Sequence, residues 1–104
     1  MRHLGVLEGS GTLESAGRPL GRADYEFDGY LVGPGQVVAS GEVHMPNVAL
    51  QEAFGRTDLV LQTDDGQSLP IRFSGKVLGQ TADVAHADIR EGLPPPAMWK
   101  RRQA

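Results

Sequence analysis

Cysteine is absent from this chain of 104 residues. Its absence excludes a disulfide framework, a thiol nucleophile and zinc held by cysteine, so packing and hydrogen bonds must hold the fold together. Long apolar runs are also missing, and Glu8 soon follows the N-terminal residues, so the sequence predicts neither a membrane span nor a signal peptide. We therefore expect a cytoplasmic protein with no membrane partner.

Basic residues are few, and most of them are scattered. The chain has 13 acidic and 10 basic residues, which gives a formal net charge of -3. Its one basic cluster is Lys100-Arg101-Arg102 at the C-terminal end, whereas proteins that bind nucleic acid need a clustered basic face. We therefore expect no nucleic-acid partner. Arginine outnumbers lysine eight to two, a usage typical of a GC-rich bacterial genome.

Alternating apolar and acidic residues define the clearest strand of the chain. Every second side chain of residues 23–28 is apolar, which is the pattern of a strand with one buried and one solvated face. Residues 33–35 read Gly-Pro-Gly and are typical of a turn, after which residues 37–45 alternate again. The two segments predict an antiparallel hairpin. Residues 4–15 also have strand character, and their three glycines predict a sharp bend or a bulge.

The second half of the chain predicts a short helix, another hairpin and a last strand. Asn47 is a favourable N-cap for about two helical turns that end at Gly55. Residues 59–73 form a strand, a turn and a strand, and residues 81–89 contain mostly small apolar side chains. About six mainly antiparallel strands with one short helix predict an all-β fold, either a small barrel or a compact two-sheet sandwich. Residues 1–91 would form this single domain.

Two local rules disagree about the register of the second hairpin. A two-residue loop at Asp65-Gly66 would place Leu61 opposite Pro70 and split the apolar side chains between both faces. Pairing Leu61 with Ile71 keeps these side chains together, and burial of a large apolar side chain is worth about 1.5 to 3 kcal/mol. We therefore predict this second register, with a loop of three or more residues or a bulge. The predicted centre of the core is Tyr25, Phe27, Leu61, Ile71 and Phe73.

No set of residues has the spacing of a known catalytic or metal-binding motif. The three histidines lack ligand spacing, and Ser40 lacks the strand-to-helix context of a nucleophile elbow. Asp24, Glu26 and Asp28 share one strand face, where they could hold a cation or act as acid and base in a small enzyme. A solvated strand face is the interpretation that we favour for their spacing, so we expect no metal and no cofactor.

Two arginines precede the first clear strand, in Arg18-Pro19-Leu20-Gly21-Arg22. Guanidinium groups on one loop can clamp a phosphate or a carboxylate through bidentate hydrogen bonds. This R-x-x-x-R segment resembles the first signature of PilZ domains, and the second signature of that family has no match in the chain. The resemblance implies a six-stranded barrel that senses cyclic di-GMP through Arg18 and Arg22. Two surface arginines that flank a turn are the interpretation that we favour over this resemblance.

Residues 92–104 form a separate, proline-rich and basic tail. Three consecutive prolines favour an extended backbone, and the apolar pair Met98-Trp99 follows them. Either this pair covers an open end of the fold as a lid, or residues 94–102 form a recognition peptide for a protein partner. Since the chain lacks a convergent set of catalytic residue types, the leading interpretation is a non-enzymatic binding or adaptor module.

Overall fold

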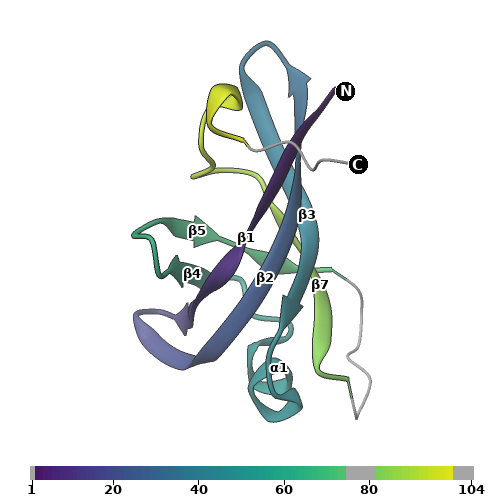
Figure 1. Ribbon diagram of the computed structural model, residues 1–104. Coiled ribbons are helices and arrows are strands. Elements are labelled where there is room, and N and C mark those ends of the chain that lie inside the picture. Colours follow the sequence, from purple (N-terminus) through teal and green to yellow (C-terminus); the bar gives the residue numbers. More distant parts are fainter. Residues whose placement is uncertain (1, 75–81, 100–104) are drawn as a thin grey trace.

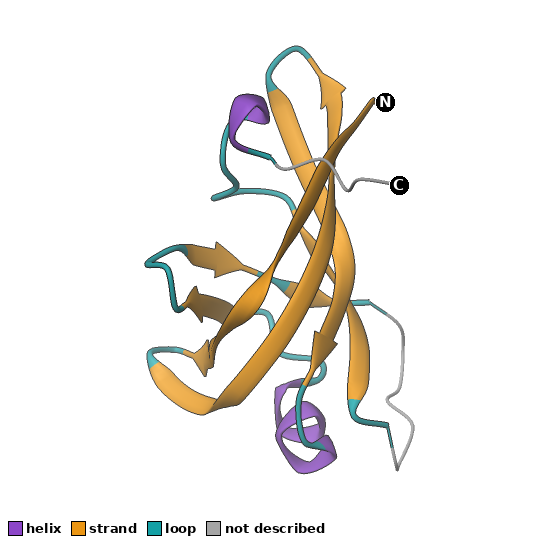
Figure 2. Cartoon of the chain, viewed as in Figure 1, coloured by secondary structure: helices purple, strands orange, loops and turns teal. Residues whose placement is uncertain are grey.

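Antiparallel strands make up most of the molecule (Figure 1, Figure 2). The computed structural model describes residues 2–74 and 82–99. The strands are β1 (Arg2–Ser15), β2 (Arg18–Gly33), β3 (Gln36–His44), β4 (Leu59–Thr63), β5 (Ser68–Pro70), β6 (Arg72–Phe73) and β7 (Val84–Ile89). In this described part of the chain, one helix, α1 (Asn47–Ala53), and one turn of 3-10 helix, η1 (Pro96–Met98), accompany the strands. The predicted all-β class with one short helix is confirmed.

The seven strands of the described residues belong to one sheet, in the order β5-β4-β1-β2-β3-β7-β6. The strands at the two ends of this order, β5 and β6, are separated in the chain by Ile71 alone. One short stretch of chain therefore pairs with β4 on one side and then with β7 on the other. The single sheet curls into a half-barrel, and residues 68–73 supply the strands at both of its edges (Figure 1). The architecture is therefore barrel-like rather than a sandwich of two sheets.

The two longest strands, β1 and β2, pair from Arg2 opposite Leu31 to Ser15 opposite Arg18, and they cross the molecule from end to end (Figure 1). Their register shifts between His3 and Gly5 and again between Leu13 and Glu14. The predicted irregularity of the first strand is thus confirmed. The predicted hairpin of β2 and β3 is also confirmed, with the turn at residues 34 and 35.

The register of the β4–β5 hairpin differs from the prediction. Leu61 lies opposite Leu69, so the predicted pairing of Leu61 with Ile71 is wrong. The loop nevertheless has three residues, because the Thr63 amide donates to the Gln67 carbonyl at 2.8 Å and Gly66 adopts a φ of 94°. The observed register also keeps the apolar side chains on one face, since Leu69 is itself apolar and fully buried.

The helix α1 forms where the sequence predicts it, but its N-terminus is capped differently. Pro46 occupies the N-cap position, and Asn47 is the first helical residue. The Asn47 amide donates instead to Asp83 Oδ1 at 2.9 Å, and its side chain donates to the Ala82 carbonyl. The predicted N-cap role of Asn47 is therefore wrong, because a carboxylate from the segment before β7 takes that place.

The core fills the inside of the curled sheet. All five residues of the predicted centre, Tyr25, Phe27, Leu61, Ile71 and Phe73, are buried. At one end α1 contributes the buried side chains of Leu50 and Ala53, and at the other end lies the segment that contains η1 (Figure 1). The last strand, predicted over residues 81–89, begins at Val84, and Thr81 lies outside the described residues.

Candidate functional site

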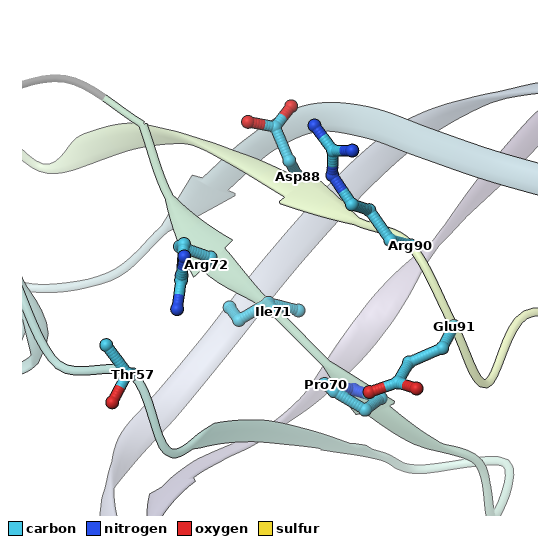
Figure 3. A pocket seen from close by; sticks show the side chains of 7 residues that line it. All are labelled: Thr57, Pro70, Ile71, Arg72, Asp88, Arg90 and Glu91. Atoms are coloured by element: carbon cyan, nitrogen blue, oxygen red, sulfur yellow. The ribbon is translucent and has the colours of Figure 1, made fainter.

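Two hollows flank the C-terminal end of β7, and both are lined by Asp88 and Arg90. The first, which we call the seam hollow, has a volume of about 350 Å³ (Figure 3). It is lined by Thr57, Pro70, Ile71, Arg72, Asp88, Arg90 and Glu91. The second, which we call the hairpin hollow, has a volume of about 530 Å³. It is lined by Tyr30, Val32, Gln36, Val38, Ala39, Ser40, Asp88, Ile89 and Arg90.

The seam hollow exists because the chain changes its pairing partner at Ile71. β5 pairs with β4 and β6 pairs with β7, so the ladder is interrupted between them. The chain that leaves β7 then passes over β5, where an added Cβ on Gly92 would lie 3.1 Å from Pro70 Cδ. The hollow lies between residues 90 and 91, which follow β7, and residues 70 and 71, where the chain leaves β4 to pair with β7. Pro70 and the buried Ile71 give it an apolar wall.

Four charged side chains line the seam hollow: Arg72, Asp88, Arg90 and Glu91. Arg72 lies opposite Asp88 in the ladder, yet within the described residues the side chain of neither Arg72 nor Arg90 makes a hydrogen bond or an ion pair. In Figure 3 the Arg90 side chain extends on the same side as Asp88, whereas Arg72 extends toward Thr57. A guanidinium without a protein partner can bind a carboxylate or a phosphate through paired hydrogen bonds.

The hairpin hollow is the more apolar of the two in residue type. Tyr30, Val32 and Val38 come from the β2–β3 hairpin, beyond the last ladder pair of β3 with β7 at Ala39 and Ile89. Val32 is exposed, and the Tyr30 ring packs edge-on against His3 at a centroid distance of 5.3 Å. Arg90 therefore stands between an apolar surface and a polar, charged one.

Arg18 and Arg22, which the sequence proposes as an anion clamp, are not brought together. Arg22 makes two hydrogen bonds to the Asp64 carboxylate, at 2.8 and 2.6 Å. Arg18 lies opposite Ser15, and with Arg56 it lines a separate small hollow of about 100 Å³. The register shift between the two positions changes which face each residue takes, so a spacing of four residues does not align their side chains.

The Arg22 ion pair shifts the titration of both partners. Its hydrogen bonds, and secondarily its charge, hold the pKa of the Asp64 carboxyl below its usual value. The same contacts raise the pKa of the Arg22 guanidinium. Both side chains remain more than half exposed, so the pair is a surface contact rather than a buried one.

The acidic strand face, Asp24, Glu26 and Asp28, lies on the outer side of the sheet. Ser10 donates to Asp24 at 2.5 Å, and His3 Nε2 lies 3.0 Å from Asp28 Oδ1. Glu26 stands in the ladder between Glu8 and Glu42. Within residues 2–74 and 82–99 no group of histidines and carboxylates is arranged to hold a metal ion.

Met98 and Trp99, proposed from the sequence as a partner-binding pair, face different surroundings. Trp99 is only 8% exposed and its Nε1 donates to the Pro94 carbonyl at 3.1 Å. Its indole lies over Gly29, where an added Cβ would come within 2.7 Å of the ring. Met98 is 68% exposed. Trp99 is therefore buried against β2, whereas Met98, the other residue of the expected lid, is not covered.

The charged residues around β7 were not singled out by sequence reasoning. Asp88 lies on the polar face of β7 and Arg90 directly follows the strand, but Arg72 joins them only through the pairing of β6 with β7. Searches of known protein families, of curated proteins and of solved structures found no match to this chain. Neither helix of the described part of the chain is long and apolar enough to cross a membrane.

Proposed function

We propose that the protein is a non-enzymatic binding module that holds a ligand with a carboxylate beside an apolar group. The observation that supports this is the place of Arg90, which lines both hollows and has no protein partner in the described residues. The apolar group of the ligand would lie on Tyr30 and Val38, and its carboxylate would pair with the Arg90 guanidinium. Volumes of about 350 and 530 Å³ fall within the size range of small-molecule sites.

The apolar group and the carboxylate of this ligand each match a property of the site. Binding of an apolar group on the hairpin hollow removes part of the Val32 and Tyr30 surface from water. A carboxylate supplies the bidentate acceptor that matches a guanidinium in shape and charge. The nearby carboxyl of Asp88 would disfavour a second anionic group close to the first, so we expect a singly charged ligand to bind best.

The test uses N-acetylphenylalanine and its uncharged amide, N-acetylphenylalaninamide, as a matched pair of probes. Each is titrated into ¹⁵N-labelled protein, and the amide shifts of Val38, Ser40 and Arg90 are followed. We expect the acid to shift these signals at lower concentration than the amide. In Arg90→Gln the two probes should bind equally weakly, because the charge that distinguishes them is gone.

Arg18→Gln is the matched control, since it removes an exposed arginine that lines a different hollow. It should leave the preference for the acid unchanged. Equal binding of acid and amide to the wild-type protein, or loss of the preference in Arg18→Gln alone, would refute the proposed site.

A further inference from the structure

The N-terminal half of β1 has an open edge. β1 pairs with β2 from Arg2 onward, but on its other side β4 pairs only with residues 11–15. The Ser10 carbonyl marks the direction of the backbone groups, because it accepts the Asp64 amide on the β4 side. In an antiparallel strand alternate residues point their backbone groups the same way, so those of Val6 and Glu8 point to this open edge.

Nothing in the described part of the chain pairs with this edge. No backbone hydrogen bond from outside the sheet reaches Val6 or Glu8 within residues 2–74 and 82–99. Glu8 and Gly9 are exposed, and Val6 is half-buried. Residues 3–10 contain neither the proline nor the lysine that often protects an edge strand. Unpaired amides and carbonyls on an exposed edge are the groups that a further strand pairs with.

The negative charge beside the open edge of β1 favours a basic strand as its pairing partner. Glu8 lies directly opposite Glu26, which lies directly opposite Glu42, so three carboxylates form a row that reaches the open edge. A second copy paired through the same edge would bring two such acidic rows together, in a protein with a net charge of -3. A strand with basic side chains on its outer face would instead continue the row with opposite charge.

We propose that the open edge of β1 binds an extended, basic segment of a partner protein as an added antiparallel strand. Its backbone pairs with Val6 and Glu8, and its outward lysines or arginines lie beside Glu8. Its inward side chains, which are apolar, extend the partly buried surface of Leu7, whose ladder partner is the fully buried Phe27. This surface is separate from the two hollows around β7, so the proposal stands without the small-ligand function.

The experiment compares two capped peptides, acetyl-Lys-Val-Lys-Val-Lys-amide and acetyl-Glu-Val-Glu-Val-Glu-amide, with ¹⁵N-labelled protein. We expect the lysine peptide to shift the amide signals of Val6 and Glu8 and to slow their hydrogen exchange. The glutamate peptide should bind at least roughly tenfold more weakly, because it repeats the charge of the edge. Glu8→Gln should weaken the lysine peptide roughly threefold, within the range for cross-strand charge pairs.

Val6→Pro removes the Val6 amide that points to the open edge and leaves every charge in place. It should therefore abolish binding of the lysine peptide. Glu14→Gln is the matched control, because Glu14 lies on β1 where β4 already pairs with it, and it should change nothing. If Val6→Pro does not fold, hydrogen exchange in the wild-type protein decides the question alone. Equal binding of the two peptides, unchanged exchange at Val6 and Glu8, or a dimer formed through this edge would overturn the proposal.

Discussion

Small residues on the inner face of the sheet make room for Trp99. Gly5 lies opposite Gly29, and Gly29 lies opposite Ala39, so three neighbouring strands present almost no side chain at one level. The indole of Trp99 lies over Gly29 at this level and belongs to the hydrophobic core. The sequence shows the tryptophan and the glycines, but they become partners only when the strands are in register.

Replacing Gly29 with alanine should displace the Trp99 side chain. The new methyl group would lie 2.7 Å from the indole, so one of the two must move, at a cost of about 1 to 3 kcal/mol. Gly33→Ala is the control, because an added Cβ there meets nothing within 4 Å. Tryptophan emission should shift to the red and become easier to quench in Gly29→Ala only. Unchanged emission in both variants would show that Trp99 is not held against this strand.

Replacing Arg22 with glutamine should raise the pKa of Asp64 toward its usual value. The folded pKa of Asp64 lies below the unfolded one, so the ion pair stabilises the fold above the unfolded pKa. That stabilisation is lost as the pH falls through the folded pKa. Because both side chains are exposed, the effect on stability should be small and should shrink in salt.

The measurement is a carboxyl ¹³C titration of Asp64 by NMR at low and at high salt. Arg18→Gln serves as the control, since Arg18 lines a different hollow and the hydrogen bonds to Asp64 come from Arg22. An Asp64 titration that is the same in wild type and Arg22→Gln would contradict the ion pair.

At the scale of single elements, local patterns predicted which segments form strands better than how they join. The unbroken alternation of residues 23–28 lies within β2, as expected. The register of β4 and β5 was missed by two residues because Leu69 and Ile71 both satisfy the rule that apolar side chains share a face. A rule with two solutions cannot choose between them.

The start of α1 shows a second limit of local reasoning. Asn47 has the right residue type for an N-cap, but the carboxylate of Asp83, which is distant in the sequence, accepts the hydrogen bond at the start of the helix. Asp83→Ala should therefore destabilise the protein by about 0.5 to 2 kcal/mol, the usual range for loss of a helix cap. Gln51→Ala, on the exposed side of the same helix, should have little effect. Chemical denaturation of both variants checks this, and equal midpoints would exclude a capping role for Asp83.

At the scale of the whole molecule, strand order is what the sequence did not predict. Alternation assigned side chains to faces, and the five predicted core residues are all buried. The two hollows, however, arise from the pairing of β3 with β7 and of β6 with β7, which joins distant segments. Residue type alone gave no reason to place Arg72 beside Asp88, so the candidate site could be found only after the sheet was assembled.

The curled sheet encloses one core, so a cavity at its centre should weaken the entire fold. Phe27 is fully buried on β2, and Phe27→Ala should cost about 3 to 5 kcal/mol, against a typical domain stability of about 5 to 15 kcal/mol. Val48→Ala is the control, because Val48 is 80% exposed on α1 and its loss should change stability by less than about 0.5 kcal/mol. Thermal unfolding followed by circular dichroism measures both. We expect Phe27→Ala to be partly or wholly unfolded near room temperature, with helix and strand signals lost in one transition because they share the core. A Phe27→Ala protein that melts within a degree or two of wild type would place Phe27 outside the core.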